Sequence, residues 1–279
     1  MIQINGATEV YGIIGNPVRH SFSPAMHSAA FQSIGRNAVY LPFLSTKDQL
    51  AELLKAFELI GLQGFNVTVP FKEAILHHLD EVDQAAKVLG SVNTVLFGPD
   101  GWKGYSTDGP GFLRGLTEQG WEPKNKRICL LGAGGSAKAI AWSLASAKVA
   151  SITLLNRTLD RALELKTMLE SYFPQVEFLL EDQLEEYDLL INSTSLGMQG
   201  GCPANDELIA KSLRVSDIIY NPRETELLQK AQALGKKTQN GISMLLYQGV
   251  EAFEIWTKQP APVTIMQQSL EESLQLLSP

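Results

Sequence analysis

The stretch Leu130-Leu131-Gly132-Ala133-Gly134-Gly135-Ser136-Ala137 predicts the fold of the second half of this chain. It has the pattern G-x-G-x-x-A and continues the apolar segment 127–131. In such a loop the first glycine permits a tight turn, the second lets the backbone approach a pyrophosphate, and the small last residue lets helix and strand pack closely. The expected helix over 135–147 presents free N–H groups and the positive end of its dipole to phosphates. A second expected strand at 151–155 completes the context of a dinucleotide-binding site.

The residues after that second strand indicate which dinucleotide is bound. A site for NAD usually has Asp or Glu there, about 20 residues after the glycines, to hold the ribose 2′-hydroxyl. This chain has Asn156-Arg157-Thr158 instead, and Arg161 follows one helical turn later. Because a planar guanidinium suits a phosphate, the pattern favours NADP. The alternative is that Arg157 is a solvated loop residue and that Thr158 caps the next helix.

Apolar clusters alternate with amphipathic segments along the chain, which is typical of an α/β fold with mostly parallel sheets. Strands are expected at 10–14, 38–43, 64–69, 91–97, 102–105, 127–131, 151–155, 176–179, 188–191 and 215–219. Helices are expected after Pro24 and over 47–60, 71–88, 135–147, 158–171, 242–257 and 264–277. Turn residues at 99–101 predict a hairpin between the fourth and fifth strands. The polar segment 120–126 is the expected domain boundary.

Length and composition exclude several classes of protein. A chain of 279 residues with 44% hydrophobic and 19% charged residues suggests two globular domains. No apolar run reaches the roughly 18–20 residues of a membrane span, and no secretory signal is visible. Two cysteines are too few for a disulfide framework, so we expect a cytoplasmic protein. A net charge of −7 without a run of five like charges offers nucleic acid no basic footprint.

Hydroxyl, amide, amino and carboxyl side chains gather at expected strand ends in the first half, where open α/β sheets bind ligands. The residues are Ser21, Ser23, Asn66, Thr68, Lys72, Asn93 and Asp108. Such a set suits a small polyhydroxylated acid. Taken singly, each residue has a structural explanation: Ser23 or Asp108 can cap a helix, and Lys72 can face solvent.

The four histidines lack the spacing of a metal site. His77 and His78 are adjacent on an expected helix, where their side chains diverge by about 100°, so they cannot easily chelate one ion together. We therefore expect no metal, and surface positions for His77 and His78.

Several motifs follow one another in order along nearly the whole chain. The first half carries Gly15-Asn16-Pro17, Ser21-Phe22-Ser23-Pro24, Asn66-Val67-Thr68-Val69-Pro70-Phe71-Lys72, Val92-Asn93-Thr94 and Thr107-Asp108-Gly109. The second half adds Asn192-Ser193-Thr194-Ser195-Leu196-Gly197-Met198, Tyr220-Asn221-Pro222, and Gly241 with Met244, Leu245 and Gln248, to the glycine-rich loop and Asn156-Arg157-Thr158. Together they resemble the shikimate dehydrogenase family. One departure is Ser106, where that family more often has Asn.

The resemblance implies an α/β, two-domain fold. A Rossmann-like NADP-binding domain is expected over 121–240, and an α/β substrate-binding catalytic domain over 1–120, with helices of 241–279 packing back on it. The implied activity is that of an oxidoreductase that reversibly reduces 3-dehydroshikimate to shikimate with NADP, in the shikimate pathway to chorismate and the aromatic amino acids. The implied partners are small molecules, without nucleic acid or membrane, and the chain is expected to be a monomer or a homodimer.

The resemblance also implies roles for individual residues. Lys72 and Asp108 are the expected catalytic pair, and Ser21 and Ser23 are expected to hold the substrate carboxylate. The expected substrate contacts are Ser21, Ser23, Asn66, Thr68, Lys72, Asn93, Asp108, Tyr220 and Gln248. The expected cofactor contacts are Gly132, Ala133, Gly134, Gly135, Ser136, Ala137, Asn156, Arg157, Thr158, Arg161, Thr194, Ile218 and Gly241.

Chemistry gives the two catalytic residues different tasks. Hydride addition to a ketone develops negative charge on the oxygen, which an ammonium group stabilises and protonates, so Lys72 fits this role. Asp108 orients the ammonium through a charge-assisted hydrogen bond. This hypothesis requires the two side chains to meet beside the nicotinamide.

Three alternatives stay open. A quinate/shikimate dehydrogenase of the same superfamily, with relaxed substrate or NAD use, would share the catalytic pair. A dinucleotide-binding sensor without catalysis would lack Lys72 or Asp108, since a fold alone does not imply activity. A methylene-tetrahydrofolate dehydrogenase shares a two-domain NADP arrangement, but Ser21, Ser23 and Asn66-Val67-Thr68 fit a hydroxylated cyclic acid better.

Overall fold

The chain divides into two units in the computed structural model, which describes residues 4–183 and 186–276. Unit 1 holds the residues up to Thr107 and those from Gln248 onward, and unit 2 is Asp108–Tyr247. The chain therefore passes from one unit to the other twice. The second crossing lies inside helix α9 (Ile242–Thr257).

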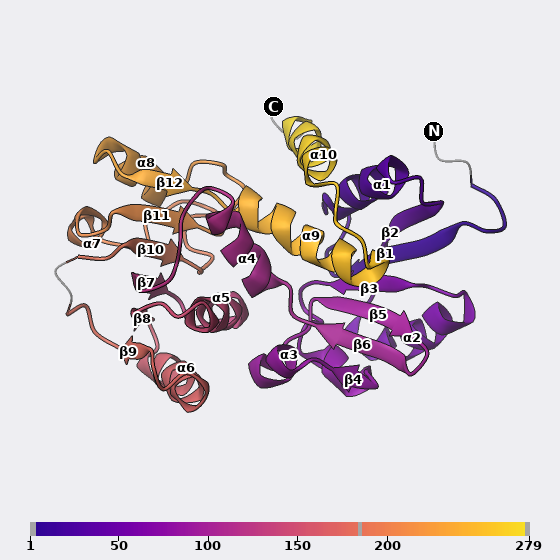
Figure 1. The fold of residues 1–279 in the computed structure, drawn as a ribbon, viewed down its shortest axis with the longest axis horizontal. Coiled ribbons are helices and arrows are strands. Elements are labelled where there is room, and N and C mark those ends of the chain that lie inside the picture. Colours follow the sequence, from indigo (N-terminus) through magenta and orange to yellow (C-terminus); the bar gives the residue numbers. More distant parts are fainter. Residues whose placement is uncertain (1–3, 184–185, 277–279) are drawn as a thin grey trace. The chain divides into compact units, whose positions relative to one another are not determined.

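Unit 2 is built on a sheet of six parallel strands in the order β12-β11-β10-β7-β8-β9 (Figure 1). The strands are β7 (Arg127–Leu131), β8 (Ser151–Leu155), β9 (Glu177–Leu179), β10 (Leu189–Asn192), β11 (Arg214–Asp217) and β12 (Lys237–Gln239). If these six strands are numbered 1 to 6 in sequence order and read from the β9 edge, their order is 3-2-1-4-5-6. This is the strand order of doubly wound dinucleotide-binding sheets. The predicted Rossmann-like fold is confirmed.

Helices cover both faces of this sheet. One face packs on α4 (Asp108–Thr117), α5 (Gly135–Ser146) and α6 (Leu159–Tyr172). The other packs on α7 (Asp206–Ala210) and α8 (Glu226–Ala233). Successive residues of β7 enter opposite cores: Ile128 and Leu130 on one side, Cys129 and Leu131 on the other. Because both faces are buried from Ile128 onward, the strand is continuously apolar from there rather than alternating.

Unit 1 contains a mixed sheet in the order β2-β1-β3-β5-β6-β4. The strands are β1 (Glu9–Gly15), β2 (Ala38–Leu44), β3 (Gly64–Val67), β4 (Glu81–Val82), β5 (Thr94–Gly98) and β6 (Gly101–Tyr105). β1 runs parallel to β2 and β3, whereas β5 runs antiparallel to β3 and β6. The predicted hairpin is the β5–β6 pair, and it introduces the antiparallel direction into the sheet.

The expected helical region 71–88 is interrupted. It contains a 3₁₀ turn (Ala74–His78), the short strand β4 and helix α3 (Gln84–Leu89). The Asp80 carboxylate accepts a hydrogen bond from the Trp102 N–H at 2.8 Å, which ties this segment to β6. Asp83 then caps α3 by accepting from the Ala86 N–H at 2.7 Å. The contact of Asp80 with β6 thus overrides the helical pattern, and the Asp83 cap starts a new helix after it.

The remaining helices of unit 1 pack on its sheet or on one another. They are α1 (Ser23–Ser33), α2 (Leu50–Leu59), which follows a 3₁₀ turn (Lys47–Gln49), the second half of α9, and α10 (Val263–Gln275). α2 buries Leu50, Leu54 and Phe57, which recur on one helical face as predicted. α10 packs against α1 (Figure 1).

Aromatic rings fill the core around α1, β2 and α9, and His27 lies among them. Its ring centroid lies 4.6 Å from that of Tyr40 and 5.1 Å from that of Trp256. The side chain is fully buried, and within the described part of the chain neither ring nitrogen has a hydrogen-bond partner. Burial therefore lowers the pKa of His27 to about 3. His77 and His78, in contrast, are exposed as predicted.

We expect acid to destabilise the fold through His27. The unfolded chain takes up this proton near the ordinary pKa of 6.5, whereas the folded protein keeps the imidazole neutral down to about pH 3. Between these values the unfolded state binds more protons, so lowering the pH lowers the free energy of unfolding, by about 2 kcal/mol at about pH 5. Above about pH 6.5 this contribution is fully retained. Urea unfolding curves across this pH range measure it.

His27→Phe keeps a ring in the cluster and removes the titration, so its stability should depend less on pH than that of the wild type. His77→Gln, at an exposed position, is the matched control and should follow the wild type. Parallel pH profiles for the wild type and His27→Phe would refute this role.

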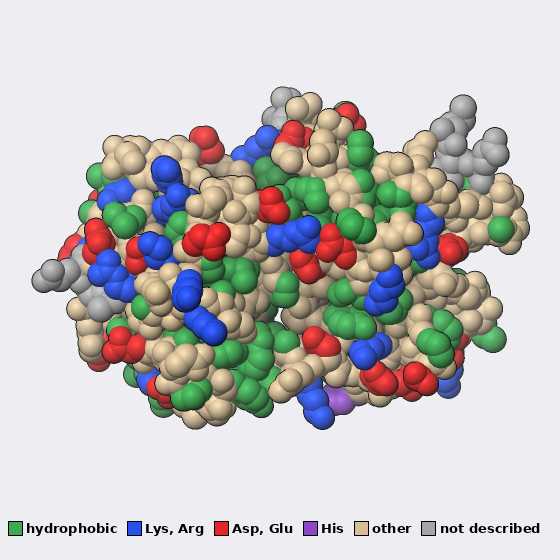
Figure 2. Space-filling model, in the orientation of Figure 1, with side chains coloured by type: hydrophobic (Ala, Val, Ile, Leu, Met, Phe, Trp, Pro, Cys, Tyr) green, Lys and Arg blue, Asp and Glu red, His purple; other side chains and the backbone are tan. Residues whose placement is uncertain are grey.

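The surface carries both signs of charge. Figure 2 shows acidic and basic side chains interspersed over one face, in keeping with the mixed charge pattern of the sequence. Across residues 4–183 and 186–276, no helix combines the length and apolarity needed to cross a membrane.

Candidate active site

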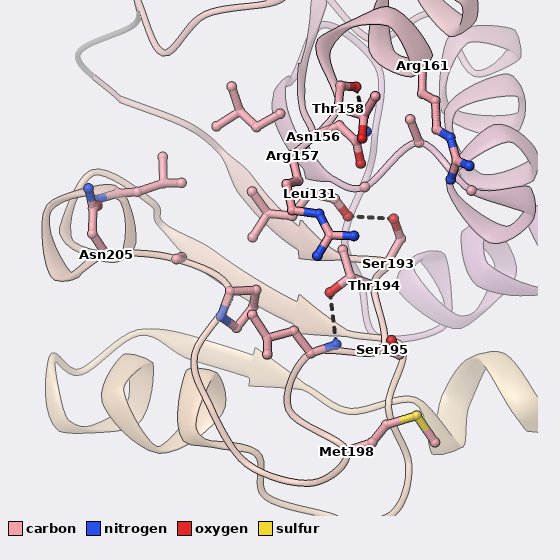
Figure 3. A pocket seen from close by; sticks show the side chains of 18 of the residues that line it. Leu131, Asn156, Arg157, Thr158, Arg161, Ser193, Thr194, Ser195, Met198 and Asn205 are labelled. Carbon is pink, nitrogen blue, oxygen red and sulfur yellow. Dashed lines mark hydrogen bonds between the residues drawn. The ribbon is translucent and has the colours of Figure 1, made fainter.

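A pocket of about 1430 Å³ opens in unit 2 at the carboxyl ends of its central strands (Figure 3). It is lined at the end of β7 by Leu131, at the end of β8 by Leu155, and after β10 by Ser193. Between β7 and β10 the strand order reverses direction, and ligands of open α/β sheets bind at this switch point. The predicted cofactor residues in the lining are Gly132, Ala133, Gly134, Asn156, Arg157, Thr158, Arg161 and Thr194.

The glycine-rich loop is shaped by contacts that exclude larger side chains. Gly132 has a positive φ of 110°, and a Cβ there would lie 2.7 Å from Ser193 Oγ. Gly134 and Gly135 have nothing within 4 Å of the equivalent position, so their backbone is open to a ligand. α5 begins at Gly135, and its first N–H groups lie beside this open space.

Two arginines give the pocket a cationic side. In Figure 3, Arg157 extends from the end of β8 toward Ser193 and Thr194, and Arg161 comes from the first turn of α6. Asn156 Nδ2 donates to the Thr158 carbonyl at 2.7 Å and fixes the loop between them. Thr158 occupies the N-cap position of α6 without a side-chain capping bond.

Asp182 is the one acidic residue among the described lining residues, and it is already engaged. Its carboxylate accepts from Lys211 Nζ at 3.2 Å and from the Tyr187 hydroxyl at 2.9 Å. Neither Arg157 nor Arg161 forms an ion pair with an acidic side chain in the described ranges. An open backbone cradle and two arginines near it fit the phosphates of NADP.

The other predicted cofactor residues, Gly135, Ser136, Ala137, Ile218 and Gly241, are not among those that line the pocket. Ser136 and Ala137 are in the first turn of α5, where Ala137 is buried in the core and permits close packing. A Cβ on Gly241 would lie 1.9 Å from the Ile218 carbonyl oxygen, so only glycine lets these two segments pack. Tyr220, predicted to contact substrate, is half-buried in unit 2, and burial raises its pKa.

In unit 1, the predicted substrate residues Asn66 and Asn93 belong to one buried hydrogen-bond network. Asn66 Oδ1 accepts from the Tyr40 hydroxyl at 2.7 Å. Asn66 Nδ2 donates to the Asn93 carbonyl at 3.1 Å and to Thr94 Oγ1 at 3.0 Å. Every polar atom of the Asn66 amide therefore has a partner, and the side chain is held rigidly at the end of β3.

Thr107 extends this network to the point where the chain leaves unit 1. Asn93 Oδ1 accepts from the Thr107 N–H at 2.7 Å, and Asn93 Nδ2 donates to Thr107 Oγ1 at 3.0 Å. Thr107 Oγ1 donates to the Gln248 carbonyl at 3.0 Å. One threonine hydroxyl thus joins the two places where the chain passes between units, although they are 141 residues apart in sequence.

The two predicted serines lie at the start of α1. Ser21 Oγ accepts from the Ser23 N–H at 3.2 Å, and Ser23 is buried. Burial raises the pKa of Tyr40 well above its ordinary value, while a hydrogen bond with Ser23 acts against this. Thr68 follows β3, and its Cγ2 occupies the space that a Cβ on Gly15 would need, at 2.4 Å.

The proposed catalytic pair draws one residue from each unit. Lys72 is partly buried, and its carbonyl accepts from the Val92 N–H at 2.9 Å. Asp108 is the first residue of α4 and is bonded directly to Thr107 of the buried network. The residue that precedes it is therefore held by the same hydrogen bonds that hold Asn93.

Sequence reasoning did not single out Tyr40, His27 or Asp217. Each is buried, and the contacts that mark it out are made with residues that no local sequence pattern identifies. Tyr40 and Asp217 acquire their partners from segments distant in sequence or from the adjacent strand. For the described residues, no group of His, Cys, Asp and Glu has the arrangement of a metal site.

Three models of related protein families match successive parts of the chain. A family model described as the shikimate dehydrogenase substrate binding domain matches residues 13–95. One described as shikimate/quinate 5-dehydrogenase matches residues 116–199, and the shikimate 5′-dehydrogenase C-terminal domain matches residues 241–271. The three matches follow the order of the motifs in the sequence.

Individual relatives match over nearly their full length. The chain is 43% identical to the shikimate dehydrogenase (NADP(+)) of Moorella thermoacetica over 284 residues, covering 98% of this chain and 96% of that protein. The Thermus thermophilus shikimate 5-dehydrogenase, solved with NADP(H) and shikimate, has a TM-score of 0.86 at 34% identity, covering 95% and 99% of the two chains. The Listeria monocytogenes enzyme, solved with shikimate and NAD, has a TM-score of 0.89 at 35% identity, covering 96% and 98%. This chain therefore belongs to the shikimate dehydrogenase family.

Proposed function

We propose that this chain catalyses the reversible reduction of 3-dehydroshikimate to shikimate with NADPH. The observation that carries the proposal is the pocket of unit 2, where a glycine-rich cradle and two arginines lie at the switch point of a parallel sheet. The family to which the chain belongs indicates the substrate class. The relatives named above are shikimate dehydrogenases, and one is solved with both NADP(H) and shikimate.

The two units divide the work in this proposal. Unit 2 binds NADP, with the diphosphate at the start of α5 and the 2′-phosphate at Arg157 and Arg161. Unit 1 binds the substrate, with the hydroxyls of Ser21 and Ser23 on its carboxylate. The remaining proposed substrate contacts are Asn66, Thr68, Lys72, Asn93 and Gln248 of unit 1, together with Asp108 and Tyr220 of unit 2.

The chain itself supplies the proton chemistry. Bound NADPH supplies the hydride that reaches the substrate carbonyl carbon. As negative charge develops on the carbonyl oxygen, the Lys72 ammonium stabilises it and donates the proton that completes the hydroxyl. The Asp108 carboxylate orients the Lys72 ammonium by accepting a charge-assisted hydrogen bond from its Nζ. Solvent then returns a proton to the lysine.

Steady-state assays of NADP reduction test the proposal. Shikimate and quinate are each supplied with NADP and with NAD, and nicotinamide reduction is followed by absorbance. We expect the highest kcat/KM with shikimate and NADP. Absence of turnover with every pair contradicts the proposal, and a higher kcat/KM with quinate or with NAD supports the quinate/shikimate alternative instead.

A further inference from the structure

The loop that follows β10 lines the cofactor pocket and is wrapped around one buried amide. Asn192, the last residue of β10, is fully buried. Its Oδ1 accepts from the Thr194 N–H at 3.0 Å and from Thr194 Oγ1 at 2.7 Å. Its Nδ2 donates to the Leu196 carbonyl at 3.1 Å. The loop of residues 193–196, all of which line the pocket, thus takes its shape from the orientation of this amide.

An amide can be turned by 180°, which exchanges its donor and its acceptor. Turned that way, Asn192 would present its NH₂ to the Thr194 N–H and its oxygen to the Leu196 carbonyl, and both contacts would be repulsive. Asp217 prevents this, because its Oδ1 accepts from Asn192 Nδ2 at 3.0 Å. The two residues face each other across the parallel pair β10 and β11. A carboxylate only accepts hydrogen bonds, so it selects one orientation of the amide.

Asp217 is itself held by a second and a third contact. Its Oδ1 also accepts from the Ile219 N–H at 3.0 Å, and its Oδ2 accepts from Thr225 Oγ1 at 2.7 Å. All three partners are uncharged, and the carboxylate is fully buried. Burial therefore raises the pKa of Asp217, and the three hydrogen bonds oppose that rise. A buried carboxylate with neutral partners is costly for stability, which calls for a functional reason.

The contact with Ile219 links Asp217 to a second segment that carries predicted cofactor contacts. The Ile219 carbonyl accepts from the Gly241 N–H at 2.9 Å, and Gly241 packs directly on the Ile218 carbonyl. Ile218, Gly241 and Thr194 are the cofactor contacts expected from the family resemblance. One carboxylate thus orders the segments that carry all three.

We propose that Asp217 is a positioning residue for NADP binding: it fixes the Asn192 amide, and through it the 193–196 loop, in the shape that accepts the dinucleotide. This inference rests on the proposed function of the chain. Asp217 contributes geometry rather than charge, since its partners are neutral and it does not line the pocket.

The conservative substitution separates geometry from charge. In Asp217→Asn, Oδ1 still accepts from Asn192 and Ile219, and the new NH₂ faces Thr225 Oγ1, which reverses to accept. In Asp217→Ala all three bonds are lost. We expect the Kd for NADPH, measured by fluorescence titration of the protein without substrate, to rise at least about tenfold in Asp217→Ala and to stay within about threefold of wild type in Asp217→Asn.

Two further measurements exclude a general loss of stability. Hydrogen exchange in residues 192–197 should accelerate in Asp217→Ala and not in Asp217→Asn, and the Kd for shikimate should stay unchanged in both. Thr117→Val is the matched control, because it removes a half-buried hydroxyl that donates to the Arg114 carbonyl at 3.0 Å in the same unit, and neither residue lines the pocket. It should lower the Tm without changing the Kd for NADPH.

Thr225→Val keeps the proposal testable if Asp217→Ala does not fold. It removes only the bond to Oδ2, and we expect a rise of about threefold or more in the Kd for NADPH. The inference is overturned if the variant that folds binds NADPH like the wild type, or if Asp217→Asn loses as much affinity as Asp217→Ala. If the wild type itself binds no NADPH, the proposed function fails instead.

Discussion

Lys72→Ala should lower kcat for shikimate oxidation by about a thousandfold while changing the Kd for shikimate much less. In the proposed mechanism the ammonium acts on charge that develops only in the transition state, so its loss lowers kcat rather than binding. Stopped-flow or steady-state kinetics give kcat, and equilibrium titration with shikimate gives the Kd. The Tm should stay close to that of the wild type, because Lys72 is only partly buried.

A matched lysine separates this role from a change in net charge. Lys87 is exposed on α3 in the same unit, and Lys87→Ala should keep the wild-type kcat. The kcat of Asp108→Asn should fall between those of Lys72→Ala and Lys87→Ala, because the amide oxygen still accepts a hydrogen bond from Lys72 but lacks the charge that strengthens it. A Lys72→Ala enzyme with the wild-type kcat would remove Lys72 from the mechanism.

Arg157→Ala should raise the KM for NADPH by about 30- to 100-fold and the KM for NADH by about threefold or less. The two cofactors differ only in the 2′-phosphate, so the ratio of the two effects isolates the contact with that group. Arg157 lies in the pocket without an ion-pair partner in the described residues, which leaves its guanidinium available to a phosphate. Initial-rate measurements with both cofactors at saturating shikimate give the ratio.

Arg161→Ala tests whether the second arginine also contacts the 2′-phosphate. We expect it to raise the KM for NADPH by less than Arg157→Ala does. Arg214 is the control, since it begins β11 and therefore lies at the amino edge of the sheet, opposite the pocket. Arg214→Ala should leave both KM values unchanged. Equal increases for NADPH and NADH in Arg157→Ala would end the 2′-phosphate interpretation.

Local sequence patterns were sufficient to predict most of the longer strands and helices of unit 2. The strand–loop–helix around Gly132 depends on neighbours in sequence: an apolar run, two glycines and an alanine-rich helix. The same holds for β8 and α6, whose boundaries the structure places close to those expected. Short elements were missed, such as α7, α8 and β12, because few residues carry too little periodic signal.

The expected helical region 71–88 shows where prediction from local sequence fails. Its composition favours helix, yet Asp80 binds the Trp102 N–H and places Glu81 and Val82 beside β6. That partner is 22 residues away, so no window of local sequence contains it. His27 is similar, because its burial depends on rings from β2 and α9.

By itself, the sequence determined the fold class, the place of the dinucleotide loop and the family, because each rests on residues adjacent in the chain or on motifs in a fixed order. Tertiary structure alone decided how the polar residues are held. Asn66 is fixed by Tyr40 and Thr94, and Asn192 is fixed by Asp217, through bonds between side chains from different strands. The physical reason is that a hydrogen bond depends on distance and direction in space, and residues 25 or more apart in sequence acquire these only when the strands pair.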